Sequence, residues 1–118
     1  MRHPKLNIKK TSECTCEDDF RNLIARQIRK KGHTIYKEFY LDEDSRVDLG
    51  MPYDKTVIEV KLNKEASSGS KPGESCDEQV ARYKETLKVL YPNETWTTYL
   101  VSLDGSLGLT LNELLNQI

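Results

Sequence analysis

The segment that most constrains the fold is a mainly apolar stretch, residues 56–62, that reads Thr-Val-Ile-Glu-Val-Lys-Leu. Its β-branched residues predict a strand, and its apolar character predicts a central place in a sheet. Residues i and i+2 of a strand point to the same face, so Glu59 and Lys61 project together. Charged groups among apolar neighbours are costly to bury unless they are paired or bind metal. The two charges therefore mark a candidate site.

The preceding extended segment, residues 46–51, can bring a third charged side chain to the same place. If residues 52–55 form the turn of a hairpin, Asp48 reaches the face that carries Glu59 and Lys61. An ion-pair ladder on a half-exposed sheet is the ordinary alternative, because opposite charges often face each other across strands. The apolar neighbours and the helices that can cover the sheet favour a functional site.

Periodicity along the chain predicts one α/β domain with the element order α-β-β-β-α-β-α. A length of 118 residues is typical of a single domain. We expect a flexible basic arm over residues 1–12 and a folded domain over residues 13–118. The expected helices span residues 15–31, 76–90 and 111–118, and the expected strands span residues 33–41, 46–51, 56–62 and 96–103.

Helix-capping pairs mark the three predicted helix starts: Thr15 with Asp18, Ser75 with Glu78, and Thr110 with Glu113. In the first helix, Glu17 lies at the edge of the apolar stripe, so it is the acid that can hang over the sheet, whereas Asp18 and Asp19 point elsewhere. The second helix is expected to bury Val80, Tyr83, Leu87 and Leu90. Residues 64–75 are small and polar, which predicts a flexible loop that either gates a substrate or simply connects.

Asp48, ten further residues and Glu59-x-Lys61 resemble the active site of the PD-(D/E)XK nuclease superfamily. Residues 79–83, Gln-Val-Ala-Arg-Tyr, are similar to the QxxxY element of the nuclease domains of bacterial recombination helicase-nucleases. The proline that names the motif is absent, because Val47 precedes Asp48. The resemblance spans roughly residues 15–104. It implies a restriction-endonuclease-like core, with a mixed central sheet flanked by helices, in the order reached above from periodicity.

The resemblance implies Mg²⁺-dependent hydrolysis of DNA, with Mn²⁺ as a substitute. Asp48, Glu59 and the backbone carbonyl of Val60 would hold the ion. Glu17 would reach this ion or a second one through water. Lys61 would orient or help to deprotonate the attacking water and offset charge on the phosphate. Such an ion is held in proteins by few carboxylates together with waters and substrate oxygens.

The resemblance also implies that Gln79 and Tyr83 help to bind the substrate, since residues four apart share one helix face. Packing in the core is the alternative for Tyr83, because aromatic residues at helical spacing usually pack. Both positions therefore remain candidates for substrate binding.

The net charge of −1 gives no overall positive field, but cations gather on the first helix. Of these, Arg21, Arg29 and Lys30 are candidate contacts for phosphates, and a solvated helix face is the equally simple reading. A homodimer, as in the similar archaeal junction resolvases, would double these contacts and follow the symmetry of duplex DNA. The alternative function is a non-catalytic nucleic-acid-binding or assembly subunit that retains the fold.

The cysteines Cys14, Cys16 and Cys76 give an odd count, which argues against a disulfide framework. Their spacing is not that of a common zinc module. Unpaired thiols are typical of a reducing compartment. No apolar run approaches the ~20 residues that span a bilayer, and the first residues lack the apolar core of a signal peptide. These features predict an intracellular protein without a membrane partner.

Overall fold

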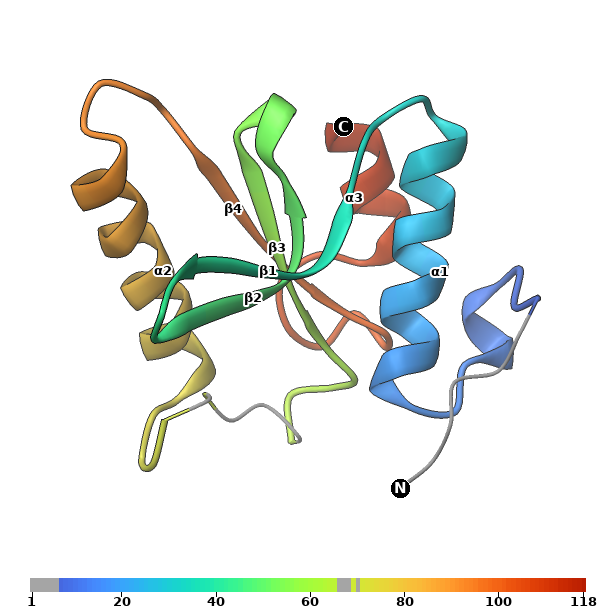
Figure 1. Ribbon diagram of the computed structural model, residues 1–118. Helices are drawn as coiled ribbons and strands as arrows, with labels where there is room; N and C mark the ends of the chain where they lie inside the picture. The colour runs from blue at the N-terminus through green and yellow to red at the C-terminus, as the bar shows by residue number, and fades with distance from the viewer. Residues whose placement is uncertain (1–6, 66–68, 70) are drawn as a thin grey trace.

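The computed structural model describes residues 7–65, 69 and 71–118, and it confirms the predicted order α-β-β-β-α-β-α. A mixed four-stranded sheet lies between helices on its two faces (Figure 1). The elements are α1 (Glu17–Lys30), β1 (Tyr36–Asp42), β2 (Ser45–Met51), β3 (Thr56–Lys61), α2 (Cys76–Leu90), β4 (Thr97–Ser102) and α3 (Leu111–Gln117), with the short 3-10 helices η1 (Thr11–Glu13) and η2 (Pro52–Asp54).

The strands follow the order β1-β2-β3-β4, with β3 inside the sheet and buried along its whole length. The first three strands form an antiparallel meander, and β4 runs parallel to β3. The β2–β3 hairpin closes through η2, after which Lys55 takes a left-handed conformation with φ of 50°. The predicted central position of residues 56–62 is confirmed.

Two separate apolar clusters cover the two faces of the sheet. On one face, α1 and α3 pack through Phe20, Ile24 and Leu114 onto apolar residues of the sheet. On the other face, Tyr83 and Leu87 of α2 pack onto strand residues that include Val57. Consecutive residues of β3 alternate between these clusters, as the pleat of a strand requires.

Two of the three predicted helix caps are confirmed. Ser75 and Glu78 form a reciprocal capping box at the start of α2, and Thr110 and Glu113 form another at the start of α3. Each box satisfies two backbone N–H groups that a helix start leaves without an intrahelical partner.

The predicted cap of the first helix is wrong. The α1 helix begins at Glu17, and the N-cap residue Cys16 makes no side-chain hydrogen bond. The backbone N–H and the hydroxyl of Thr15 donate instead to Oδ2 of Asp19, at 2.8 and 2.9 Å. Asp19 is fully buried, with its carboxylate bonded to the residue that precedes the N-cap. A carboxylate one turn into the helix satisfies donors that precede it.

The buried face of α2 also differs from the expected one. It consists of Cys76, Gln79, Tyr83 and Leu87. Leu90, the last residue of the helix, is 41% exposed, so its predicted burial is wrong. At this end of the helix the neighbouring apolar cover comes from Trp96, which packs against the α2 cluster and stacks on Tyr91.

Two predicted flexible segments lie partly outside the described residues, namely residues 1–6 of the arm and residues 66–68 and 70 of the loop. In the described part of the arm, Ile8 is buried and its carbonyl accepts a hydrogen bond from Arg26 Nη1 at 3.0 Å. After the loop, Glu74 is clamped by the guanidinium of Arg82, with nitrogen–oxygen distances of 2.8 and 3.1 Å. No helix among the described residues is long and apolar enough to cross a membrane.

Candidate active site at a fork in the sheet

The strands β2 and β3 part at the open end of their hairpin, and we call this place the fork (Figure 1). The predicted strand residues Asp48, Glu59 and Lys61 lie beyond the last paired residues. Strand pairing toward the fork ends at Leu49 and Ile58. Beyond this pair, the Val60 N–H donates to Oδ2 of Asp48 at 2.8 Å. The Asp48 N–H in turn faces Oε1 of Glu59 at 3.4 Å. Side-chain carboxylates therefore replace backbone partners where the strands separate.

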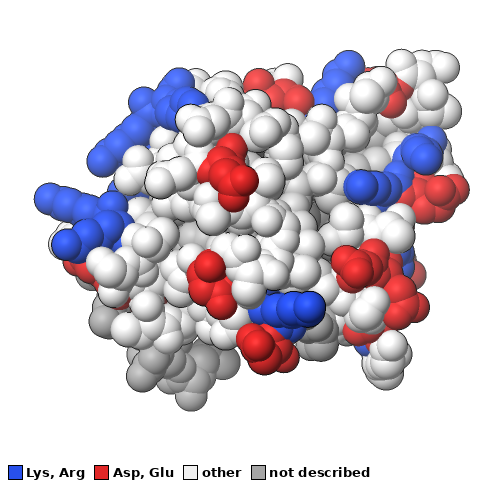
Figure 2. Space-filling view, turned by 180° about the vertical axis from the view of Figure 1, so that it is seen from behind, with Lys and Arg blue, Asp and Glu red and all other residues white. Residues whose placement is uncertain are grey.

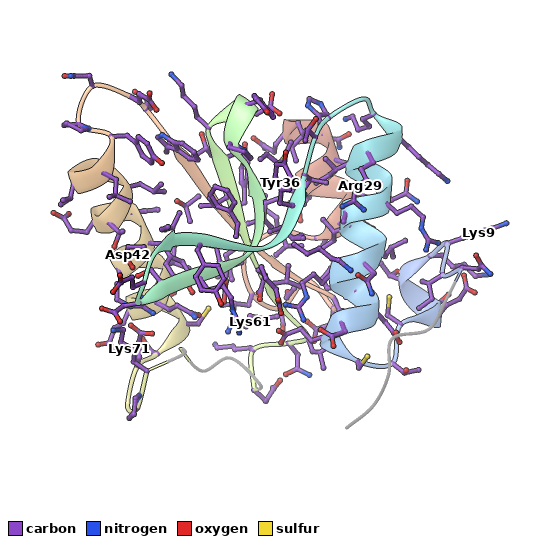
Figure 3. The ribbon with its side chains drawn as sticks, viewed as in Figure 1. Lys9, Arg29, Tyr36, Asp42, Lys61 and Lys71 are labelled. Atoms are coloured by element: carbon purple, nitrogen blue, oxygen red, sulfur yellow. The ribbon has the colours of Figure 1, made fainter. Side chains whose placement is uncertain are left out.

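Lys61 completes the arrangement on β3. Its Nζ lies 3.4 Å from Oε2 of Glu59, so the two side chains do project together. Both residues are almost inaccessible, at 7% for Lys61 and 3% for Glu59. Figure 3 shows Lys61 in the space between the diverging strands, with α1 and α2 on either side. This pair is buried rather than part of an exposed ladder.

Arg21 and Glu17 reach the fork from α1. Arg21 Nη1 lies 3.2 Å from Oδ1 of Asp48, and the same guanidinium pairs with Asp18. Glu17 lies one turn earlier on the helix, where Asp48, Lys61 and Arg21 all act on its charge. The structure thus gathers Glu17, Arg21, Asp48, Glu59 and Lys61, four of which were predicted as catalytic and one as a substrate contact.

Electrostatics at the fork favour protonated carboxyls. Burial, followed by repulsion from Asp48, raises the pKa of Glu59 to about 8, against the attraction of Lys61. Burial and then Asp48 also raise the pKa of Glu17. Desolvation and like charge both disfavour the ionised form. An added cation at the fork would favour the ionised forms of these carboxyls.

The carboxylate oxygens at the fork are of the kind that Mg²⁺ prefers, but they already have protein partners. No group of three or more His, Cys, Asp or Glu side chains in the described residues is arranged to hold a metal ion. Asp48 and Glu59 form a pair of carboxylates, which suffices for an ion that keeps several waters. Their oxygens, however, are engaged by Arg21, Lys61 and backbone N–H groups. Each carboxylate oxygen has a further lone pair, so a bound ion would share these oxygens with their present partners or displace Arg21 or Lys61.

Gln79 and Tyr83 form a buried hydrogen-bonded chain toward β2. Gln79 Nε2 donates to the Tyr83 hydroxyl at 2.9 Å, and that hydroxyl donates to the Arg46 carbonyl at 2.8 Å. Tyr83 is fully buried, which is the core packing weighed above as its alternative. Gln79 Oε1 is buried with no hydrogen-bond partner among the described residues. This acceptor is an unsatisfied polar group close to the start of α2.

Cys76 is a neighbour of the site that the sequence did not reveal. It is the first residue of α2, it is buried, and burial raises the pKa of its thiol. Lys61, Glu59 and Asp48 all lie within electrostatic range of this thiol. The start of α2 therefore lies near the fork. The position of Cys76 near the fork depends on the course of the loop between β3 and α2, which residue spacing in the sequence does not predict.

The remaining predicted phosphate contacts lie elsewhere. Arg29 donates to the Ile35 carbonyl at 3.0 Å, and Lys30 is exposed near the end of α1. Arg29 lies eight positions after Arg21, which is about 12 Å along a helix axis. Figure 2 shows Lys and Arg side chains mainly toward the left and right of that face, with a further basic group at the lower centre and Asp and Glu side chains scattered between them. The structure does not bring Arg29 and Lys30 to the fork.

Comparison of the chain with protein-family models, with curated proteins and with solved structures finds no match. What the fold shows is an α/β domain with a mixed four-stranded sheet and flanking helices. The geometry of the fork is therefore the basis for a functional proposal.

Proposed function

We propose that the protein is a nuclease of the PD-(D/E)XK superfamily that hydrolyses phosphodiester bonds of DNA with Mg²⁺ or Mn²⁺. The observation that supports this most is the fork itself. There the buried Glu59 and Lys61 meet the half-buried Asp48 at the open end of a hairpin, with Glu17 close by on α1. A cluster of buried charges with raised pKa values is costly to maintain, and such clusters are concentrated at functional sites.

In this proposal Asp48 and Glu59 hold the divalent ion, with the Val60 carbonyl and Glu17 as further contacts. When bound, the ion activates water and neutralises charge on the phosphate. Glu59 must lose its proton to bind the ion, because only the ionised form is a ligand. The raised pKa of Glu59 therefore couples ion binding to proton release.

Lys61 and Arg21 act on the substrate in this proposal. The Lys61 ammonium has a flexible stem, so it can turn from Glu59 Oε2 toward the attacking water and the phosphate. The Arg21 guanidinium leaves Asp48 Oδ1 for the phosphate, which it can grip through two parallel hydrogen bonds. Both movements free carboxylate oxygens that the ion needs.

A second candidate function has an observation in its favour. Every oxygen of Asp48 and Glu59 already has a protein partner, so the fork is satisfied without an ion. This state suits a non-catalytic nucleic-acid-binding or assembly subunit that keeps the fold. In either case we infer a homodimer, because the near-neutral chain gains phosphate contacts when two copies act together.

Cleavage of plasmid, linear and branched DNA with Mg²⁺ and Mn²⁺ tests the nuclease proposal. Lys61→Ala should lower kcat on the order of 10²-fold or more, since Lys61 acts on water and phosphate. Asp48→Asn should remove most of the divalent affinity measured by calorimetry. The matched control is Lys84→Ala, an exposed lysine of α2, which should cleave as the parent chain does.

Near-normal turnover by a folded Lys61→Ala chain would contradict the catalytic role proposed for Lys61 and leave it as an ion-pair partner of Glu59. DNA binding by the parent chain without any cleavage would favour the non-catalytic subunit. Light scattering of the chain, alone and on DNA, tests the dimer, and a monomer in both states would rule it out.

A further inference from the structure

A polar pocket lies beside the fork, between α1 and β1. It has a volume of about 400 Å³ and is lined by Asp18, Arg21, Asn22, Lys37 and Glu38. Arg21 belongs to both places, since its guanidinium lines this pocket and contacts Asp48. A volume of this size lies within the range of small-ligand sites. We call it the α1–β1 pocket.

The strand register confirms that the pocket adjoins the carboxylate pair. Lys37 pairs with Leu49, and Phe39 pairs with Val47, so Glu38 lies opposite Asp48. Glu38 has a φ of 56°, which is unusual for a residue other than glycine within a strand. A ligand in the pocket would therefore sit next to the group bound at Asp48.

The charges of the pocket balance one another. Asp18 pairs with Arg21, and Glu38 lies 3.8 Å from Arg46. Lys37 Nζ donates to Oδ1 of Asn22 at 2.6 Å. The lining thus presents hydrogen-bond donors and acceptors without a strong excess of either sign.

This balance favours a neutral polar ligand over a phosphate. A phosphate in the pocket would meet the carboxylates of Asp18 and Glu38. A nucleobase offers donors and acceptors along its edges, and amide, carboxylate and ammonium side chains are the groups that read such edges. Its uncharged ring avoids the repulsion that a phosphate would meet.

We propose that the α1–β1 pocket binds a base of the substrate, from a nucleotide next to the phosphate held at the fork. This inference rests on the proposed function for the identity of the substrate. A base can enter a pocket only after it leaves the stack, which is least costly when it is unpaired. The substrate class is therefore DNA with unpaired nucleotides at the cleaved position, such as a single strand or a branch, rather than regular duplex.

Binding of short single-stranded oligonucleotides tests the pocket independently of cleavage. The Lys61→Ala chain is mixed with an oligonucleotide, and in parallel with the same oligonucleotide carrying abasic sugars, and affinity is measured by fluorescence anisotropy. We expect the abasic strand to bind at least 5-fold more weakly. Asn22→Ala and Lys37→Ala, added to the same chain, should bring the two strands to similar affinity, whereas Lys84→Ala should preserve the difference.

Equal affinity for the two strands in the Lys61→Ala chain would overturn the pocket proposal. So would competition between inorganic phosphate and the oligonucleotide, if that competition disappears in the Asn22→Ala variant. Binding that depends on the base, in a chain whose parent never cleaves DNA, would support the pocket and contradict the nuclease proposal. Equal rates of cleavage on ordinary and abasic strands would support the nuclease proposal and contradict the pocket proposal. The two proposals can therefore fail separately.

Discussion

The two faces of β3 differ in what they bury. Ile58 and Val60 face α1 and α3, where they belong to a cluster of apolar side chains. The intervening residues on the other face begin with Val57, which packs against α2, and continue with Glu59 and Lys61. One strand of six residues thus carries a conventional core on one side and buried charges on the other.

This difference indicates a division of roles between the faces. Apolar burial contributes stability on both faces, whereas Glu59, Lys61 and the unsatisfied Gln79 Oε1 on the α2 side reduce it. The apolar contacts have to offset the cost of these polar groups for the chain to fold. Removing the apolar side chain of Ile58 should therefore lower stability, whereas removing the ionisable group of Glu59 should raise it at pH 8.

The largest effect is expected on the apolar face. Ile58→Ala should lower the free energy of unfolding by about 2–5 kcal/mol, because it removes buried methyl groups and leaves a cavity. Urea denaturation measures this loss. The exposed Val89→Ala is the control, with an expected change within about 0.5 kcal/mol. A loss below about 1 kcal/mol for Ile58→Ala would remove the basis of the comparison.

On the polar face, the stability of the metal-free chain should depend on pH through Glu59. The folded chain binds this proton more tightly than the unfolded chain, since the pKa is raised from 4.5 to about 8. Its contribution is thus complete below about pH 4.5 and is lost as pH rises toward 8. We expect the free energy of unfolding to fall by on the order of 4 kcal/mol across this interval.

Urea denaturation at several pH values, in a chelating buffer, measures this dependence. Glu59→Gln should remove most of the fall and be more stable than the parent chain at pH 8, because its amide cannot ionise. Glu85→Gln, at an exposed position of α2, should behave as the parent chain does. A parent chain that becomes more stable between pH 5 and 8 would show that Glu59 is ionised without cost.

The smallest effect concerns the hydrogen-bonded chain that joins α2 to β2. Tyr83→Phe removes the partner of both Gln79 Nε2 and the Arg46 carbonyl, so it should cost about 1–2 kcal/mol. Adding Gln79→Met should recover part of this loss, since it removes the stranded amide. Thermal unfolding of the single and double variants measures the coupling. Additive losses would mean that the two side chains act independently.

Local chemistry made the helix starts of α2 and α3 and the central place of β3 predictable. Ser75 with Glu78, and the alternation around Glu59, are signals confined to a few neighbouring residues. The start of α1 was not predicted correctly, because Asp19 competes with Asp18 for the donors of Thr15. Both acids fit the local pattern, and only packing decides between them.

Only the part of the candidate site that follows from the alternation of residues along the strands was predictable from the sequence. Glu59, Lys61 and Asp48 followed from the hairpin, and they do lie together. The contact between Arg21 and Asp48 joins residues 27 positions apart, and no local signal reports it. Cys76 likewise reaches the fork through the packing of α2 on the sheet. Such partners depend on how elements dock.

The parallel pairing of β4 with β3 has a consequence for the order of folding. Leu49 and Ile58 meet across a short hairpin, whereas Thr56 and Thr97 meet only after the whole α2 crossover. Contacts between distant residues form more slowly than local ones, because a longer loop must be closed. We therefore expect Asp48 and Glu59 to come together in a hairpin that is still open to water. Asp48 and Glu59 then lose contact with water only when α2 docks. Because a protonated carboxyl group is less costly to bury, low pH should speed the docking of α2 more than the formation of the hairpin.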